Sequence, residues 1–262
     1  MLPFSKRYQD MEYRYVTENL PKLGDKLVYC KDLLCKYHVF IDRIDAGKKL
    51  AGLLQELNIS KENSLILAIP RGGMPVAYNI ACKLNIPVDL MICRKILIPW
   101  NTEAGFGAVS PDGTFILNEY LVMELGLADD IVQNQVEKAL KEMERLCLKF
   151  RGTKEYFINA RTVVLVDDGI ASGYTMLAAV KFVRKFNPAN IIIATPTAPI
   201  SSLIMLSRDV NKIVCLNVRS SLFGFAVADA YHVWYDLSDE EVLKYINELE
   251  KRGLWYPKKQ VM

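Results

Sequence analysis

Two adjacent carboxylates, Asp167 and Asp168, come directly after the apolar run 163–166. An apolar run of this length bounded by charge is typical of a buried strand. Residues 169–175 then read Gly-Ile-Ala-Ser-Gly-Tyr-Thr, and a helical pattern follows them. A strand, a short glycine loop and a helix N-terminus together form an anion site, because free backbone N–H groups and the helix dipole point the same way. The segment therefore offers carboxylates to hydroxyl groups and amides to a phosphate, both of which a sugar phosphate carries.

A second glycine loop and a basic pair follow two other predicted strands. The sequence "PRGG" places Arg71 after the predicted strand 64–70, and Arg94 and Lys95 end the predicted strand 87–95. Ligands of open α/β sheets bind beyond the carboxyl ends of the strands, which is where the carboxylates and "PRGG" both fall. Structural explanations also remain for these residues. The carboxylates could form a strand-end turn with a helix cap, and the three basic residues could be ordinary exposed charges.

The order of predicted elements indicates the fold class. Predicted strands at 64–70, 87–95, 163–166, 190–197 and 212–218 alternate with helical patterns, among them a strongly amphipathic helix over 130–150. Such alternation predicts an α/β fold with a mainly parallel twisted sheet and helices on both faces. Residues 97–118 interrupt it, and their Pro-Asp-Gly turn between alternating segments predicts a β-hairpin arm. "GFGAVS" lies in this arm rather than at a strand-to-helix turn, which excludes a dinucleotide fingerprint.

Composition excludes several classes of protein. The apolar fraction of 51% and the charged fraction of 24% are those of a globular protein. The net charge of +3 is too small to indicate a nucleic-acid or membrane-surface partner. No apolar run approaches the ~18 residues of a membrane span, and the N-terminus lacks a secretory signal. Six cysteines without a C-x-x-C pair and two distant histidines provide no metal motif. We expect a cytoplasmic protein.

The quoted motifs resemble those of type I phosphoribosyltransferases. "VVLVDDGIASGYT" is similar to the family's 5-phosphoribosyl-1-pyrophosphate (PRPP) signature: an apolar strand, two acidic residues, three variable residues, then Thr/Ser-Gly-x-Thr. "FIDRIDAG", "AIPRGGMPVA", "RKILIPWNTEAGFGAV" and "WYDLSDEEV" resemble one subgroup of the family, in the same order along the chain. The resemblance extends from about residue 39 to about residue 242 and omits residues 1–37.

The resemblance implies a domain organisation. Residues 38–262 would form the phosphoribosyltransferase domain, with a mobile arm at about 97–118 and a small base-binding hood at about 219–236. Residues 1–37 would be an N-terminal extension or a further part of the hood. We also expect a homo-oligomer. Five aromatic residues of the hood could stack on a base, although aromatic residues at these spacings are also typical of a core: Phe223, Phe225, Tyr231, Trp234 and Tyr235.

The resemblance also implies roles for individual residues. Asp167 and Asp168 would bond the ribose 2′ and 3′ hydroxyls, and the loop after them would hold the 5′-phosphate. The residues of that loop are Gly169, Ile170, Ala171, Ser172, Gly173, Tyr174 and Thr175. The pyrophosphate would lie against Arg71, Gly72 and Gly73, with Arg94 and Lys95 as further candidates, since an arginine fork matches phosphate oxygens. Mg²⁺ would bridge pyrophosphate and ribose oxygens, and it needs few protein ligands.

One departure from the family concerns acid–base chemistry. Purine-salvage members often carry an aspartate general base in the phosphate loop, where this chain has Ala171. Adenine-type enzymes resemble this chain in that position and place a glutamate in the arm instead. Glu103 is the corresponding candidate here, and the alternative is an exposed loop carboxylate.

The resemblance implies a Mg²⁺-dependent phosphoribosyltransferase that binds PRPP or a nucleoside monophosphate. It would transfer the phosphoribosyl group to a nitrogenous base and release pyrophosphate. A non-catalytic PRPP- or nucleotide-sensing protein on the same fold is the main alternative, because a fold does not determine a function. A hydrolase of a phosphoribosyl compound is a third. The motifs do not identify the acceptor base.

Overall fold

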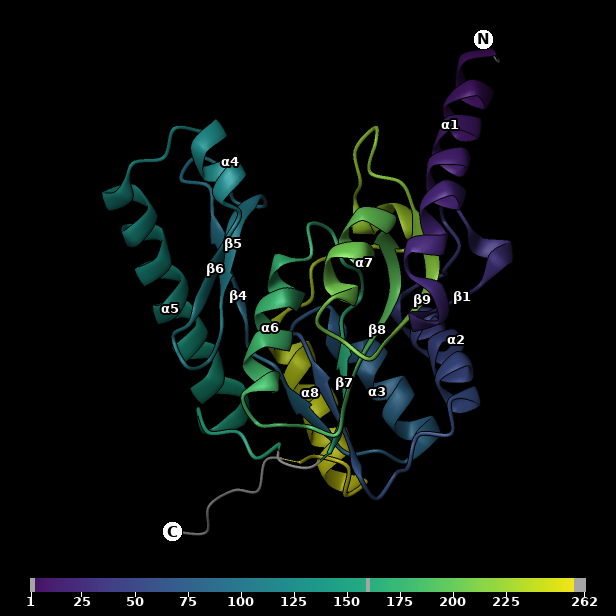
Figure 1. Ribbon diagram of the computed structural model, residues 1–262. Helices are drawn as coiled ribbons and strands as arrows, with labels where there is room; N and C mark the ends of the chain where they lie inside the picture. The colour runs from purple at the N-terminus through teal and green to yellow at the C-terminus, as the bar shows by residue number, and fades with distance from the viewer. Residues whose placement is uncertain (1–2, 159–160, 257–262) are drawn as a thin grey trace.

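The computed structural model describes residues 3–158 and 161–256 and contains one large parallel sheet (Figure 1). Its six strands lie in the order β1–β9–β8–β7–β2–β3. They are β1 (Leu27–Tyr29), β2 (Ser64–Ala68), β3 (Val88–Leu90), β7 (Thr162–Val166), β8 (Asn190–Pro199) and β9 (Lys212–Arg219). Every neighbouring pair in this sheet is parallel. The predicted α/β class with a mainly parallel sheet is confirmed.

Helices cover both faces of this sheet (Figure 1). The helices around the sheet are α1 (Pro3–Asn19), α2 (Arg43–Glu56), α3 (Gly73–Leu84), α6 (Tyr174–Arg184), α7 (Ile200–Ser207) and α8 (Asp239–Lys251). Successive strand residues point to opposite faces. In β7, Val164 and Val166 therefore join the core under α2, α3 and α8, while Val163 and Leu165 join the core under α6 and α7. Both faces of the strand are buried, which explains its continuous apolar run.

A second, smaller sheet forms the arm, together with two helices (Figure 1). It is antiparallel in the order β4–β5–β6, with β4 (Arg94–Leu97), β5 (Gly105–Val109) and β6 (Phe115–Leu117), and it leads into α4 (Glu119–Glu124) and α5 (Asp129–Arg151). The hairpin predicted around the Pro-Asp-Gly turn is present between β5 and β6. The single strand predicted over 87–95 is wrong, because β3 ends at Leu90 and β4 begins at Arg94 in the other sheet.

The N-terminal 37 residues contribute to the main sheet. Strand β1 pairs in parallel with β9 and forms one edge. Helix α1 reaches the predicted hood segment 219–236, where the rings of Tyr8 and Phe223 lie 4.7 Å apart. Residues 38–41 also pair with 229–233 through backbone hydrogen bonds, including His232 N to Phe40 O at 2.8 Å. The segment before residue 38 is thus continuous with the sheet and packed against the hood segment. Among the helices described, none combines the length and the apolar character needed to cross a membrane.

A buried ion pair joins the arm to the main sheet. Arg151, at the end of α5, donates from Nε to Oδ1 of Asp89 in β3 at 2.6 Å and from Nη2 to Oδ2 at 2.8 Å. Both side chains are only 2% exposed, and the guanidinium also lies 3.6 Å from the ring centre of Tyr156. Burial raises the pKa of Asp89 despite the hydrogen bonds from Arg151. The charge on Asp89 is therefore tolerated only while Arg151 is present.

Replacing Arg151 by Ala should destabilise the protein by roughly 3–5 kcal/mol, because it leaves an uncompensated buried carboxylate. Urea unfolding at neutral pH measures the change. Lys154→Ala is the matched control, since the Lys154–Glu144 pair is about half exposed and 2.9 Å long. An exposed pair contributes about 0.2–1 kcal/mol at most. Equal losses in the two variants would show that the Arg151 pair does not hold the arm.

Candidate functional site

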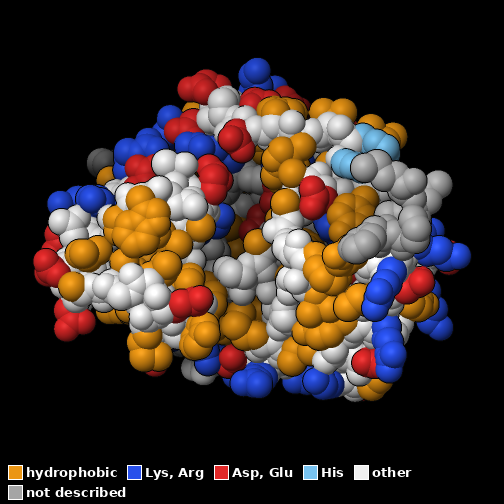
Figure 2. All heavy atoms as spheres, turned by 90° about the horizontal axis from the view of Figure 1, so that it is seen from above, with side chains coloured by type: hydrophobic (Ala, Val, Ile, Leu, Met, Phe, Trp, Pro, Cys, Tyr) orange, Lys and Arg blue, Asp and Glu red, His pale blue; other side chains and the backbone are white. Residues whose placement is uncertain are grey.

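The two glycine loops meet at the point where the order of the main sheet reverses. From β2 the chain continues to β3 on one side, whereas β7, β8 and β9 follow one another on the other side. Ala68 at the end of β2 pairs with Val166 at the end of β7, and Ile69 N donates to Val166 O at 2.8 Å. Figure 2 looks down on this end of the molecule and shows a hollow in its middle with acidic side chains inside. Ligands of open α/β sheets bind at such a reversal.

The two adjacent carboxylates have different environments. Asp168 is 8% exposed, and its Oδ2 accepts a hydrogen bond from Arg43 Nε at 2.7 Å. Asp167 is partly exposed, and its Oδ1 accepts from the backbone N–H of Asp168 at 2.9 Å. Asp168 is thus neutralised by a protein cation, whereas Oδ2 of Asp167 has no hydrogen-bond donor among the described residues.

Arg43 connects Asp168 to the hood segment. Its guanidinium lies 3.9 Å from the ring centre of Trp234 and donates from Nη1 to the backbone carbonyl of Tyr235 at 2.8 Å. The hydroxyl of Tyr231 donates to the backbone carbonyl of Asp168. Two of the five aromatic residues considered for base stacking, Tyr231 and Trp234, therefore support the acidic pair. Sequence reasoning did not select Arg43 as a site residue, although "FIDRIDAG" contains it.

The surroundings of Asp167 raise the pKa of its carboxyl. Burial is the main cause, and the neighbouring charge of Asp168 adds to it, while the positive charge of Lys95 acts in the opposite direction. The folded protein therefore favours the uncharged form of the Asp167 carboxyl. A cation or several hydrogen-bond donors from a ligand would reverse that preference.

The first glycine loop fits against the acidic pair because Gly72 has no side chain. A Cβ built on Gly72 would lie 1.9 Å from Oδ2 of Asp168, so any other residue would displace the carboxylate. The Pro70–Arg71 peptide bond is cis, and Gly73 is the first residue of α3. The sequence "PRGG" therefore allows the two loops to pack closely against each other.

The loop after the carboxylates presents free amides at the start of α6. Gly173 has φ of +85°, a conformation that glycine adopts readily, and occupies the N-cap position. Within the described chain, the backbone N–H groups of 171–176 donate to no acceptor. Ser202 Oγ donates to Ala171 O at 2.6 Å and holds the loop from below. Ala171 and Ser172 are exposed. The geometry is that of an anion cradle at a helix N-terminus.

The three predicted basic residues divide into two groups. Lys95 and Arg94 are neighbours in β4, so their side chains point to opposite faces. Lys95 lies close enough to Asp167 for its charge to lower the pKa of that carboxyl. Arg94 instead lies near Arg71, whose Nε donates to Asp239 Oδ1 at 2.6 Å. The acidic pair, the phosphate loop, Gly72 and Lys95 are therefore brought together, while the side chains of Arg71 and Arg94 belong to an adjoining cluster.

Glu103 lies at the tip of the arm, and its carboxylate forms no hydrogen bond or ion pair with the described residues. Its side chain is exposed, and its backbone carbonyl accepts a hydrogen bond from Lys95 Nζ at 3.4 Å. Asn101 Oδ1 accepts from the backbone N–H of Glu103 at 2.8 Å and shapes the turn. The carboxylate contacts none of the other predicted site residues in this structure. Its catalytic assignment stays a prediction.

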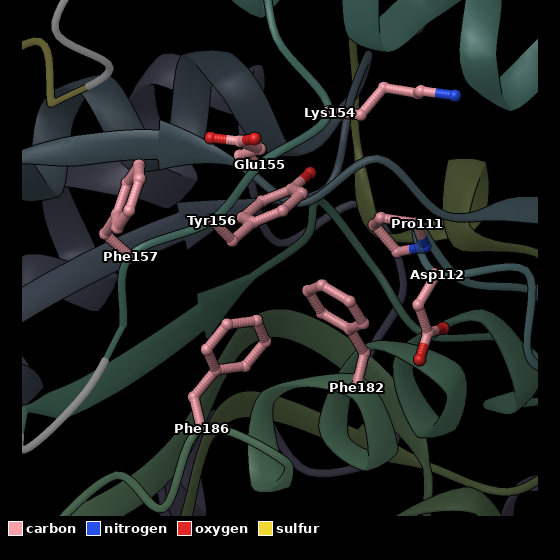
Figure 3. Close-up of a pocket in the computed structure, with 8 residues that line it drawn as sticks. All are labelled: Pro111, Asp112, Lys154, Glu155, Tyr156, Phe157, Phe182 and Phe186. Carbon is pink, nitrogen blue, oxygen red and sulfur yellow. The ribbon is translucent and has the colours of Figure 1, made fainter.

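A pocket of about 330 Å³ lies elsewhere, between the arm and α6 (Figure 3). Figure 3 shows the rings of Tyr156, Phe182 and Phe186 gathered around it. None of the predicted site residues lines this pocket. Its aromatic walls and its position exclude it as the place where the carboxylates and the phosphate loop act.

Comparison with known proteins shows which family the chain resembles. Residues 121–232 match the family model described as phosphoribosyl transferase domain, a span that includes the acidic pair and the phosphate loop. Over this span the chain is similar to type I phosphoribosyltransferases. Two curated proteins from Mycobacterium tuberculosis strains CDC 1551 / Oshkosh and ATCC 25618 / H37Rv carry the name "Putative phosphoribosyl transferase". Each is 35% identical to the chain over 215 residues, covering 81% of this chain.

The match covers only part of the length of these relatives. The chain spans 47% of the length of each curated relative. The crystal structure of TT1426 from Thermus thermophilus is similar over nearly its whole length, with 29% identity, a TM-score of 0.63 and coverage of 80% of this chain and 98% of that one. The fold of the chain and the family model that matches residues 121–232 therefore agree.

Replacing Asp167 by Asn should stabilise the protein at pH 7. Its raised pKa means that the folded state binds this proton more tightly than the unfolded state. Stability therefore falls as the pH rises from the ordinary carboxyl pKa of about 4 to the raised value. The gain in the variant should be present at pH 7 and shrink towards pH ~4. Urea unfolding at both pH values measures it.

Asp209→Asn is the control for this comparison. Asp209 pairs at 2.7 Å with Lys181, whose side chain is 47% exposed, and lies outside the site. This variant should gain no stability at pH 7. A loss of stability in Asp167→Asn at pH 7 would contradict the unfavourable setting assigned to that carboxylate.

Proposed function

We propose that this protein is a Mg²⁺-dependent phosphoribosyltransferase that takes PRPP as donor and a nitrogenous base as acceptor. The observation that supports this most is the meeting of adjacent carboxylates and a free-amide helix N-terminus at the reversal of the sheet. The first is suited to ribose hydroxyls and the second to a 5′-phosphate. The match to the family model supports phosphoribosyl transfer in general. The donor, the metal and the acceptor are the proposal.

The proposed binding mode uses the asymmetry of the acidic pair. Asp167, whose Oδ2 accepts no hydrogen bond from the described residues, would accept hydrogen bonds from the ribose hydroxyls. Asp168 would shape the site from below, because Arg43 and Gly72 already hold its carboxylate. The 5′-phosphate would accept from the amides of 171–175 and from the hydroxyls of Ser172 and Thr175. Gly73 and Lys95 would border the pyrophosphate.

The residues present are suited to Mg²⁺ held mainly through the ligand. Asp167 offers Oδ2, and a cation there would favour the charged form of this carboxyl, which burial disfavours by raising its pKa. Mg²⁺ prefers oxygen ligands and keeps several waters, so one carboxylate and ligand oxygens suffice. No cluster of three or more potential metal-binding side chains occurs in the described ranges 3–158 and 161–256. The ion would neutralise charge on the pyrophosphate as it leaves.

The reaction would break the bond from ribose C1 to the pyrophosphate oxygen and form a bond from C1 to the acceptor nitrogen. Pyrophosphate leaves with the bonding electrons, and the acceptor loses a proton. The protein's part is to stabilise the departing charge and to exclude water from an oxocarbenium-like centre. The hollow in the middle of the face shown in Figure 2 would hold the acceptor. Glu103 is the arm residue proposed to receive the proton.

Two observations favour a PRPP- or nucleotide-sensing protein as the second candidate. The phosphate loop has Ala171 in place of an acid–base residue, and the Glu103 carboxylate lies exposed at the tip of the arm. Such a protein would bind the same ligands and release no pyrophosphate. Turnover with a panel of bases therefore separates the two functions.

Asp167→Asn should weaken binding of a nucleoside 5′-monophosphate by ~10- to ~150-fold, because a hydrogen bond to a charged group contributes roughly 1.5–3 kcal/mol. Isothermal calorimetry measures the affinity, and Asp209→Asn should leave it unchanged. Asp167 is the better test position, because Asp168→Asn would also leave the buried Arg43 without its counter-charge. Unchanged affinity in a variant that is more stable at pH 7 would remove the ribose assignment.

Glu103→Gln should lower the rate of pyrophosphate release by ~10²- to ~10⁴-fold if the side chain acts as the base. PRPP affinity should stay near that of the wild type, because the phosphate loop lies elsewhere. Glu124→Gln, an exposed carboxylate in α4, is the control. Wild-type rates in Glu103→Gln would make Glu103 an ordinary loop residue. No turnover with any base, together with tight PRPP binding, would favour the sensing protein.

A further inference from the structure

Both histidines of the chain lie side by side on the surface, although they are far apart in the sequence. The centres of the His38 and His232 rings are 5.5 Å apart, and the ring planes differ by 29°. Both residues are exposed, and Figure 2 shows histidine side chains together on the face that contains the hollow. Their spacing in the sequence indicates no metal motif, whereas the fold brings the two imidazoles to one place.

The backbone around the two histidines fixes this arrangement. Residues 38–41 pair with residues 229–233 through backbone hydrogen bonds, among them His232 N to Phe40 O at 2.8 Å. His38 has φ of +51°, a conformation that is uncommon for residues other than glycine. Such a conformation persists only where the surrounding structure holds it. The two side chains therefore extend from backbone of defined shape.

One nitrogen of His38 is available to a metal ion. Its Nδ1 lies 2.9 Å from the backbone carbonyl oxygen of Tyr231, and because a carbonyl only accepts, Nδ1 carries the proton. The neutral ring then has its lone pair on Nε2, which has no hydrogen-bond partner among the described residues. Histidines that bind metals nearly always donate their other N–H in this way, which fixes the orientation of the ring. The ring nitrogens of His232 likewise form no hydrogen bond with a described residue.

The separation of the rings suits two ligands of one ion. Zinc–nitrogen bonds of about 2.0–2.1 Å place the centres of two imidazoles on a tetrahedral ion about 5 Å apart. The observed 5.5 Å is close to this value, and the exposed ring of His232 has room to turn. Imidazole nitrogen suits Zn²⁺, Ni²⁺ and Cu²⁺, whereas Mg²⁺ prefers oxygen. No third side chain of the metal-binding types joins the pair within residues 3–158 and 161–256, so water would fill the remaining positions.

We propose that His38 and His232 bind one divalent transition-metal ion, with Zn²⁺ as the main candidate, and that the ion clamps residues 38–41 to residues 229–233. Each segment carries one imidazole, so neither segment forms the site alone. The site differs from the Mg²⁺ position proposed at Asp167 in its metal and in its ligand atoms. It does not rest on the proposed function.

The clamp would act on the residues that support the acidic pair. Helix α2 begins at Arg43, directly after the first segment, and Arg43 pairs with Asp168 at 2.7 Å. The second segment contains Tyr231, whose hydroxyl donates to the backbone carbonyl of Asp168. Trp234 follows this segment and stacks on Arg43. An ion that joins the two segments would restrict movement of the hood segment relative to α2.

Calorimetry with ZnCl₂ and with NiCl₂ tests the site. The wild type should bind one ion per chain, and excess Mg²⁺ should not compete. His38→Asn and His232→Gln should each bind at least ~10- to ~100-fold more weakly, since loss of a mere hydrogen-bond partner of a ligand typically has that effect. Asparagine is chosen because it accepts a positive φ more readily than most residues. Cys82→Ser is the control, because Cys82 is the exposed cysteine and thiolates also bind zinc.

Hydrogen exchange tests the clamp. The backbone N–H of Val233 donates to Ile41 O at 2.9 Å and joins the two segments. Exchange in residues 229–233 should slow when Zn²⁺ is added to the wild type, and should not change in His232→Gln. The hairpin of β5 and β6 should exchange at the same rate with and without the ion. Unfolding curves without metal show whether each variant is folded, and His232→Gln alone decides if His38→Asn is not.

Three results would overturn the site. They are no binding of Zn²⁺ or Ni²⁺ by the wild type, equal affinity in the wild type and both histidine variants, or competition by Mg²⁺ that disappears in Asp167→Asn. The last result would place the ion at the acidic pair. Unchanged hydrogen exchange with the ion bound would overturn the clamp. Binding of a nucleoside monophosphate is measured separately, so none of these results decides the proposed function.

Discussion

The buried ion pair between Arg43 and Asp168 organises the site. Removing two charges from water is costly, and the pair is favourable only because further contacts complete it. Arg43 stacks on Trp234 and donates to the backbone of Tyr235, while the carboxylate of Asp168 fills the space that Gly72 leaves empty. One interaction thus joins α2, both glycine loops and the hood segment. These elements are distant in the sequence, and the pair adds to the contacts made by the β2–β7 pairing and by the backbone bonds between residues 38–41 and 229–233.

The same pair makes the two carboxylates unequal. Asp168 has its counter-charge inside the protein, whereas burial raises the pKa of Asp167, whose Oδ2 accepts no hydrogen bond from the described residues. A site that keeps one charge compensated and leaves the other exposed to a ligand gains binding energy when the ligand arrives. The protein without ligand is less stable as a result, as is common at functional sites. The backbone N–H groups of residues 171–176 likewise have no acceptor among the described residues, and an anion would accept hydrogen bonds from them.

The arm divides positive charge between two regions. Alternation along β4 directs Lys95 towards Asp167 and Arg94 towards Arg71 and α5. The Arg151–Asp89 pair anchors the end of α5 to β3, and Lys149 on the same helix pairs with Asp239 of α8. Two ion pairs therefore hold α5 against the rest of the fold.

The sequence by itself determined the α/β class, the two glycine loops and their position at strand ends. These depend on local signals: apolar runs, small residues and alternation of elements. It also indicated the Pro-Asp-Gly hairpin. It missed the break between β3 and β4, because residues 91–93 remain apolar where the chain changes sheets. The partners of Arg71 and Asp168 were decided only by the tertiary structure. Asp239 lies 168 residues from Arg71, and Arg43 lies 125 residues from Asp168. Such contacts depend on how layers pack, and no local pattern records which charge will meet which.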